Sequence, residues 1–116
     1  MATNASKRNN VQEMPSQTED RVEVVISVQD GKISVEPEVF QVQKHLDQEV
    51  KWTCTEGDGE FLVEFDETPF YESQFSKDAP VSGLARRAIL ADMNKVYKYT
   101  VFVGDMVLDP GGVIKK

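Results

Sequence analysis

The 116 residues are enough for one domain and a tail, and the 40% share of hydrophobic residues is typical of a soluble protein with an ordinary core. A net charge of -7 argues against a nucleic-acid backbone or an anionic membrane as the main partner, because both attract clustered lysine and arginine. No apolar run approaches the length of a membrane-spanning helix, and the single cysteine, Cys54, excludes a disulfide within the chain.

Residues 1–20 are polar and charged, with almost no periodic apolar residue. They cannot bury enough surface to offset the entropy lost on ordering, so we expect a disordered tail followed by one folded domain over residues 21–116. An arm that folds on a partner is the alternative. The N-terminus lacks the apolar segment of a signal peptide, so we expect a cytoplasmic protein, or an exported one if a leader has been removed.

Short runs with period-two alternation follow the tail and recur to the end of the chain. Asp30-Gly31 is a tight-turn signal between the first two runs, and Pro37 predicts a bend or an edge position. Residues 68–83, with two prolines and a glycine, read as a long connection, and residues 84–90 (LARRAIL) fit either a strand or a short helix. The predicted strands cover residues 21–28, 33–37, 38–45, 50–55, 60–65, 96–103 and 113–116, the last of them at a sheet edge.

In three of these runs alternate residues are large and apolar, which places them on one face of a strand. Seven or eight short strands with turn signals, and no amphipathic helix, predict an all-β sandwich. A parallel α/β fold is disfavoured because no crossover helix is available. The residues expected to face inward are Val22, Val24 and Ile26, then Val50, Trp52 and Cys54, then Phe61, Val63 and Phe65.

Several stretches, taken in chain order, resemble one family. Residues 47–52 (DQEVKW) are similar to the acidic turn and tryptophan strand of the cupredoxins, the blue-copper β-sandwiches such as plastocyanin. Residues 60–65 (EFLVEF) resemble the strand in which that family usually has Pro-His-Asn-Val-x-Phe, and residues 97–101 (YKYTV) resemble its Tyr-x-Tyr-x-Cys strand. Residues 109–114 resemble its closing strand, and residues 37–42 (PEVFQV) resemble the strand before the acidic turn. The resemblance covers roughly residues 22–114 and implies a Greek-key cupredoxin-like β-sandwich.

The same resemblance implies that the copper ligands are missing. The family's first histidine matches Phe61, its cysteine matches Val101, and residues 103–105 contain no second histidine. Met106 alone stands where the family keeps its weak axial ligand. The chemistry agrees, because a blue-copper centre needs two imidazoles and a thiolate, and His45 is the single histidine of the chain. A dimer that pools ligands from two chains stays open.

Cys54 and Met106 are candidates for a different, softer metal site. A thiolate and a thioether suit Cu(I), and we expect the end of the tryptophan strand and the loop after the tyrosine strand at the same end of the sandwich. His45 would join them if the fold brings it near. The alternative is that Cys54 and Met106 fill apolar gaps, which both residue types do well.

The other polar residues of the chain do not indicate a catalytic or metal-binding site. The carboxylates of residues 56–60 could hold Ca²⁺, but their spacing fits no EF-hand loop and a solvated acidic turn is favoured. His45 has no nucleophile turn near it in the sequence, which argues against a hydrolytic or cysteine-based reaction. Arg86 and Arg87 read as ordinary surface charge, since consecutive side chains of a strand point to opposite faces.

The sequence therefore predicts a non-catalytic, copper-less domain that binds an unidentified protein or small ligand and needs no cofactor. The alternative is copper handling or delivery through the soft site described above. The long connection is a place where a rigid sandwich often carries recognition residues, although packing into the core is favoured for its two phenylalanines. The predicted binding surface consists of Phe70, Tyr71, Phe75, Gly104, Asp105 and Met106.

Overall fold

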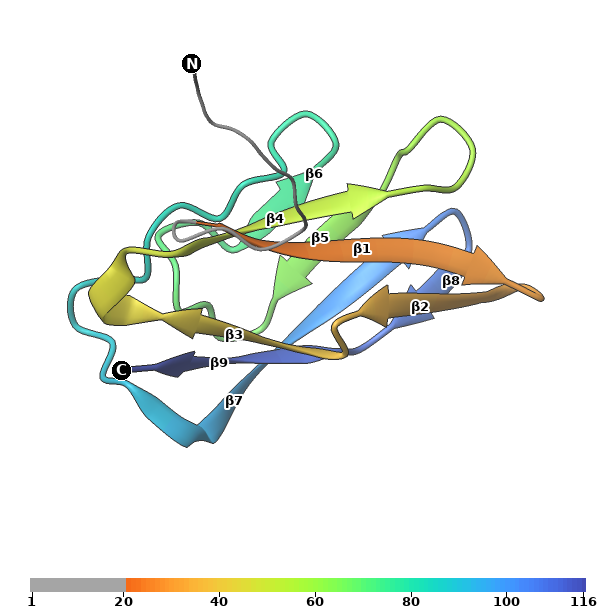
Figure 1. The fold of residues 1–116 in the computed structure, drawn as a ribbon. Coiled ribbons are helices and arrows are strands. Elements are labelled where there is room, and N and C mark those ends of the chain that lie inside the picture. Colours follow the sequence, from red (N-terminus) through yellow and green to blue (C-terminus); the bar gives the residue numbers. More distant parts are fainter. Residues whose placement is uncertain (1–20) are drawn as a thin grey trace, which may run out of the picture.

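The computed structural model describes residues 21–116, so the predicted tail over residues 1–20 lies outside the described residues (Figure 1). Within this range the chain forms nine strands, rather than seven or eight, and one 3₁₀ turn, η2 (Lys44–Leu46). The prediction of an all-β domain is confirmed. The strands are β1 (Arg21–Gln29), β2 (Lys32–Glu36), β3 (Val39–Gln43), β4 (Glu49–Cys54), β5 (Leu62–Phe65), β6 (Gln74–Ser76), β7 (Asp92–Val103), β8 (Met106–Leu108) and β9 (Gly111–Lys115).

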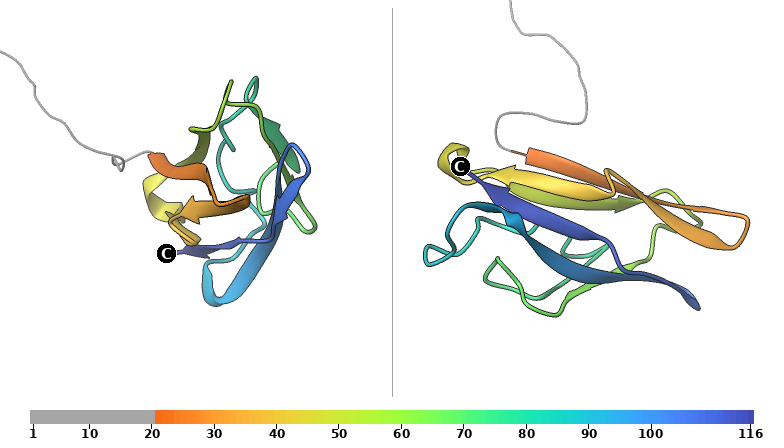
Figure 2. Two further views of the ribbon diagram at one scale, coloured as in Figure 1. Left: turned by 90° about the vertical axis from the view of Figure 1, so that its right-hand side faces the viewer. Right: turned by 90° about the horizontal axis from the view of Figure 1, so that it is seen from below.

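Two sheets of mixed direction pack against each other, as Figure 2 shows from two further sides. The first has the order β2-β1-β4, and the second has the order β3-β9-β7-β5-β6, with β8 paired to β7. β1 and β4 are parallel, as are β3 and β9, and the other neighbouring strands are antiparallel. The finer expectation of a Greek-key cupredoxin-like arrangement stays a prediction.

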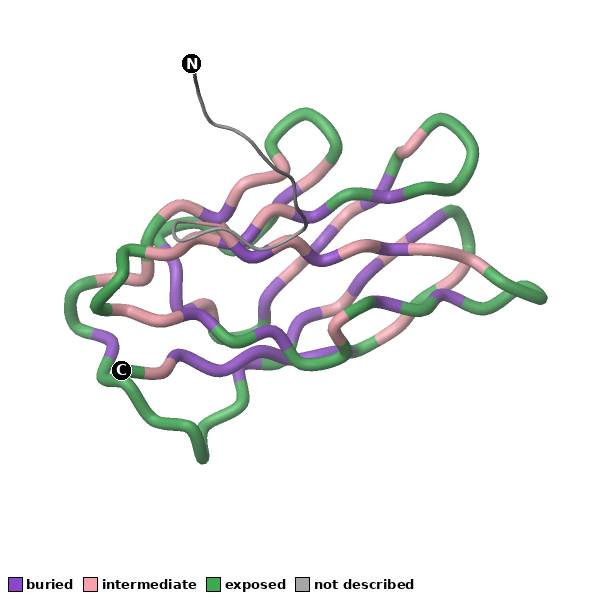
Figure 3. Tube along the Cα trace, viewed as in Figure 1, coloured by how far each residue is buried: buried purple, intermediate pink, exposed green. Residues whose placement is uncertain are grey.

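Side-chain alternation explains which face of each strand enters the core (Figure 3). In β1, every second residue from Val22 to Ile26 is buried, and the same pattern holds in β4 and β5. The parallel register sets Val24 opposite Trp52, so both apolar faces point the same way. The inward-facing residues predicted for these strands are confirmed as buried.

Two turns shape the path from the first sheet to the second. Asp30 and Gly31 both have positive φ, at 54° and 75°, which matches the hairpin turn predicted between β1 and β2. Pro37 then lies at the bend where the chain leaves β2 in the first sheet and enters β3 in the second. Both predictions, the turn and the bend, are confirmed.

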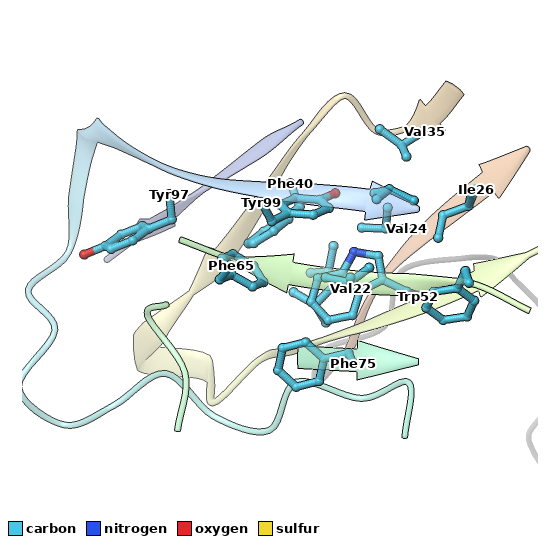
Figure 4. Close-up of a cluster of buried hydrophobic side chains, with 14 of the residues drawn as sticks. Val22, Val24, Ile26, Val35, Phe40, Trp52, Phe65, Phe75, Tyr97 and Tyr99 are labelled. Atoms are coloured by element: carbon cyan, nitrogen blue, oxygen red, sulfur yellow. The ribbon is translucent and has the colours of Figure 1, made fainter. Parts of the chain in front are cut away.

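An aromatic cluster fills the space between the sheets (Figure 4). The ring of Phe40 lies 6.2 Å from that of Trp52 and 5.9 Å from that of Tyr99, measured between centroids. Trp52 also stacks on Phe75 at 5.0 Å. Edge-on and offset contacts of this kind add to the free energy gained from burying the rings.

Gly112 is what allows Phe40 to sit at the centre of this cluster. An ideal Cβ built on Gly112 would lie only 2.1–2.3 Å from three carbon atoms of the Phe40 ring. The two residues are register partners in β3 and β9. Phe40 therefore packs directly against the backbone of β9, where only glycine leaves enough room.

Three of the expected elements are wrong. β6 forms inside residues 68–83, which read as a plain connection, because Phe75 is buried opposite Val63 of β5. Residues 84–90 form neither a strand nor a helix; the Ile89 N–H bonds the Arg86 carbonyl in a turn. β9 is not at an edge but lies between β3 and β7.

The part of the chain that the structure describes contains no helix long and apolar enough to cross a lipid bilayer.

Candidate functional site

The strand directions define two opposite ends of the sandwich. The cysteine end holds Cys54, Phe61 and the β7–β8 hairpin around Gly104, because β4 finishes, β5 starts and β7 finishes there. The leucine end holds η2, the loop over residues 66–73 and the turn over residues 84–90. Hydrogen bonds that join these three segments to one another support this grouping.

The positions that match the copper ligands of cupredoxins are occupied by packed apolar side chains at or near the cysteine end. Phe61 is 7% exposed and Val101 is fully buried, opposite Val63 in the register of β5 and β7. Met106 is half-buried, pairs with Val103 and packs against the core. The three residues that the resemblance assigns to copper-ligand positions are therefore apolar side chains packed into or against the core.

Cys54 and Met106 lie at the same end, as predicted, but His45 does not join them. His45 is exposed in η2, before the first residue of β4, whereas Cys54 is the last residue of that strand. A six-residue strand spans roughly 17 Å between its terminal Cα atoms. The fold therefore does not bring His45 near Cys54 and Met106. Residues 21–116 contain no group of three His, Cys, Asp or Glu side chains placed to hold a metal.

The acidic turn over residues 56–60 uses its polar groups to hold its own shape. The Asp58 carboxylate accepts a hydrogen bond from the Glu60 N–H at 3.1 Å, and the Asp58 carbonyl accepts one from Lys77 Nζ at 2.6 Å. The Gly59 N–H bonds the Glu56 carbonyl. This geometry is that of a solvated turn, the reading favoured by the sequence.

The predicted binding surface is not one surface. Phe70 and Phe75 are buried in the aromatic cluster, at 0% and 3% exposure, which confirms the favoured assignment of both to the core. Tyr71 is 65% exposed but lies at the leucine end, whereas Gly104, Asp105 and Met106 lie at the cysteine end. The six residues are split because β5 and β7 run antiparallel, so that the loop after β5 and the hairpin after β7 emerge at opposite ends.

Large apolar side chains gather instead at the leucine end. Leu90 is 81% exposed, Leu84 47% and Leu46 42%, and with Tyr71 they form what we call the leucine surface. All four lie on the three segments of the leucine end, which makes this end the place to look for an interaction site. This surface is not predictable from the sequence, because residues 84–90 fit a strand and a short helix equally well and form neither.

Hydrogen bonds from three segments hold the leucine surface together. The Lys44 ammonium donates to the carbonyl of Arg87, at 3.1 Å, and to that of Ile89. The Tyr71 hydroxyl accepts from the Arg87 N–H at 3.4 Å. Arg86 donates from its guanidinium to the Thr68 carbonyl and from its backbone N–H to the Pro69 carbonyl. Arg86 is thereby engaged in structure, and the exposed Arg87 side chain is the cation beside the leucines.

Two depressions meet at Val39, the first residue of β3. One, of about 360 Å³, is mainly apolar and is lined by Ile33, Val35, Val96 and Leu108 as well as Val39. The other, of about 280 Å³, is polar. It is lined by Pro37, Val39, Gln41, Gln43, Gln48 and Lys115.

A third, polar groove of about 500 Å³ crosses the outer face of β5 and β7. Glu64, Lys98 and Asp109 line it, and Asp109 accepts a hydrogen bond from the Thr100 hydroxyl at 2.8 Å. The residues that line this groove include no histidine and no cysteine, and its hydroxyl and carboxylate groups suit hydrogen bonding to a ligand.

The most perturbed ionisable group of the core is sealed from solvent. Burial raises the pKa of Tyr99 to about 12. Neither Tyr99 Oη nor Trp52 Nε1 makes a hydrogen bond, and both residues are about 1% exposed. Figure 4 shows both side chains within the aromatic cluster. The Tyr99 phenol is therefore protonated at neutral pH.

Comparison with protein-family models, with curated proteins and with solved structures finds no match to this chain. The resemblance to cupredoxins therefore rests on the motifs quoted above.

Proposed function

We propose that this chain is a non-catalytic, cupredoxin-like domain without copper that binds another protein through its leucine surface. The observation that carries the proposal is the gathering of Leu46, Tyr71, Leu84 and Leu90 on adjoining loops at one end of the domain. Exposed aliphatic and aromatic side chains beside an exposed arginine are the residue types that interfaces favour.

The partner surface that fits this end is apolar and carries a carboxylate. A depression of about 150 Å³ lies between Leu84, Lys44 and Arg87 and can take one side chain of the partner. Asp47 also borders it, so a carboxylate of the partner would pair with Arg87 on the side away from Asp47. Apolar contact would supply most of the affinity and the arginine would set the orientation.

Photo-crosslinking in the cells that make the protein tests this proposal. With p-benzoylphenylalanine in place of Leu90, we expect a discrete heavier adduct that weakens when Leu84→Ser is added. The same group in place of Glu56, exposed at the cysteine end, is the matched control and should give no such adduct. Absence of an adduct at position 90, or equal adducts at both positions, would refute the proposal.

Copper handling is the second candidate, and the placement of Cys54 and Met106 at one end of the sandwich favours it. A Cu(I) titration against a competing chelator separates the two. The first proposal expects no binding tighter than that of an ordinary thiol. Stoichiometric tight binding that is lost in Cys54→Ser and in Met106→Leu, but kept in Met93→Leu at the other end, would overturn the copper-less assignment.

We propose no enzymatic activity, because no histidine or cysteine lines the three grooves described above, and the one hydroxyl–carboxylate pair there, Thr100 with Asp109, is exposed. Steady hydrolytic or redox turnover by the purified protein would contradict this part of the proposal.

A further inference from the structure

We propose that the outer edge of β3 binds an extended, basic segment of a partner protein as an added strand, paired with the backbone of Val39 and Gln41. This site is separate from the leucine surface and does not depend on what binds there. In strand addition, main-chain hydrogen bonds provide affinity and depressions beside the edge select side chains.

The backbone of β3 has free hydrogen-bonding groups on one side. β3 is the last strand of its sheet and pairs with β9 alone. Both backbone groups of Gln43 turn away from β9: its N–H donates to Gln48 Oε1 at 2.8 Å and its carbonyl accepts from the Gln48 N–H at 3.4 Å. Backbone groups of alternate residues point to the same side of a strand, so those of Val39 and Gln41 point outward too.

These outward groups are accessible. Val39 is 45% exposed and Gln41 is exposed, and among the described residues no backbone hydrogen bond outside the β3–β9 ladder involves either of them. The far edge of the first sheet differs, because residues 80–82 cover β4 there: Trp52 N–H bonds the Pro80 carbonyl at 3.0 Å. The β3 edge is therefore open where the β4 edge is closed.

The two depressions that meet at Val39 provide for the side chains of an added strand. The apolar one suits a valine or leucine of the partner, and the polar one, with three glutamines, suits a hydrogen-bonding side chain. Both depressions are lined by Val39, and side chains two residues apart share one face of a strand, so an added strand can serve the two depressions with residues that are two apart.

Charge favours a basic partner. Glu36 and Glu38 flank Pro37 at the start of this edge, both are exposed, and neither forms an ion pair within residues 21–116. Lys98 and Lys115 line the two depressions, so a lysine or arginine of the added strand would pair with these carboxylates at the start of the edge, where the negative charge is concentrated.

A second copy of this chain fits the edge less well than a free segment does. Gln48 closes the edge beyond Gln43 and Pro37 ends it on the other side, which leaves a pairing length of two residues. In a pair of copies, each β3 would bring its own Gln48 and η2 against the other. An unattached extended peptide carries no such bulk.

Peptide binding by the full chain tests the proposal. The probe is a blocked, fluorescent octapeptide in which valine alternates with lysine, followed by fluorescence anisotropy. We expect saturable binding that weakens roughly tenfold or more when alternate peptide nitrogens are methylated, since the methyl groups remove the donors. The peptide with glutamate in place of lysine should bind more weakly.

Two variants of the chain test whether the peptide binds at the edge of β3. Gln41→Pro removes the outward N–H and should abolish binding, whereas Gln41→Ala keeps it and is the control. Glu38→Lys lies before the strand, should leave the fold intact, and should reverse the preference to the glutamate peptide. The intrinsic fluorescence of Trp52 reports whether each variant is folded.

Three results would overturn the proposal. They are no binding at millimolar peptide, equal binding of the methylated peptide, and a peptide-insensitive self-association that Gln41→Pro removes. The last would make a second copy the occupant of the edge. None of these results would change the crosslink expected at position 90, so the strand-addition proposal can be refuted without refuting the proposal for the leucine surface.

Discussion

Replacing Gly112 by alanine is expected to destabilise the domain by about 3 kcal/mol, which is large for one methyl group. The added Cβ would lie 2.1–2.3 Å from three carbons of the Phe40 ring. Ordinary carbon–carbon contact needs about 3.5 Å, so the ring would have to move by roughly 1.3 Å. Phe40 is fully buried with aromatic neighbours at 5.9–6.4 Å between centroids, so a movement of this size would disturb its contacts with those rings.

Gly111→Ala is the matched control on the next residue of β9. Its Cβ would meet one atom within 3.4 Å, Val96 Cγ1 at 2.5 Å, and Val96 is 45% exposed and free to rotate toward solvent. We expect a loss of less than about 1 kcal/mol there. Urea unfolding followed by the fluorescence of Trp52, the one tryptophan, measures both variants. At a slope of about 1 kcal/mol per molar urea, the midpoint for Gly112→Ala should fall by about 3 M, or the variant should be unfolded without urea.

The cause is tested by a double-mutant cycle with Phe40→Leu, which shortens the side chain that the new methyl group meets. The double variant should be more stable than the sum of the single losses predicts, by about 1 kcal/mol or more. Equal losses for Gly112→Ala and Gly111→Ala, or additive losses in the cycle, would refute the reasoning.

Two further predictions concern the aromatic core. The pKa of Tyr99 is raised to about 12 in the folded state and is about 10 in the unfolded chain. Between those pH values only the unfolded state loses the phenolic proton. The contribution of Tyr99 to stability is therefore full below pH 10 and falls as the pH rises toward 12. Urea unfolding should show about 1.4 kcal/mol more loss between pH 8 and pH 11 for the wild type than for Tyr99→Phe, and an equal loss in both would contradict the assignment. Phe75→Ala should cost about 3–5 kcal/mol, because its ring is 3% exposed and stacked on Trp52, whereas Tyr71→Ala at 65% exposure should cost less than about 0.5 kcal/mol by the same assay. Similar losses for the two variants would show that the assignment of Phe75 to the core and of Tyr71 to the surface is wrong.

The leucine surface and the β3 edge show how a binding site can be invisible in a sequence. Leu84 and Leu90 belong to a turn whose residues show no regular hydrophobic repeat. Buried Ile89 and the hydrogen bonds from the Lys44 ammonium anchor this turn, and the two leucines are left exposed. The outward N–H and C=O groups of Val39 belong to the backbone, and every non-proline residue carries the same two backbone groups. Neither feature has a residue pattern of its own.

The sequence by itself determined the all-β class, the inward faces of β1, β4 and β5, and the turn at Asp30 and Gly31. These are local properties, because period-two alternation and positive φ depend on residues next to one another. The tertiary structure alone decided that His45 and Cys54 lie at opposite ends of β4, that Tyr71 is separated from Met106, and that β9 lies inside its sheet. Those placements depend on strand direction and order, which follow from the packing of residues far apart in the chain around one aromatic core.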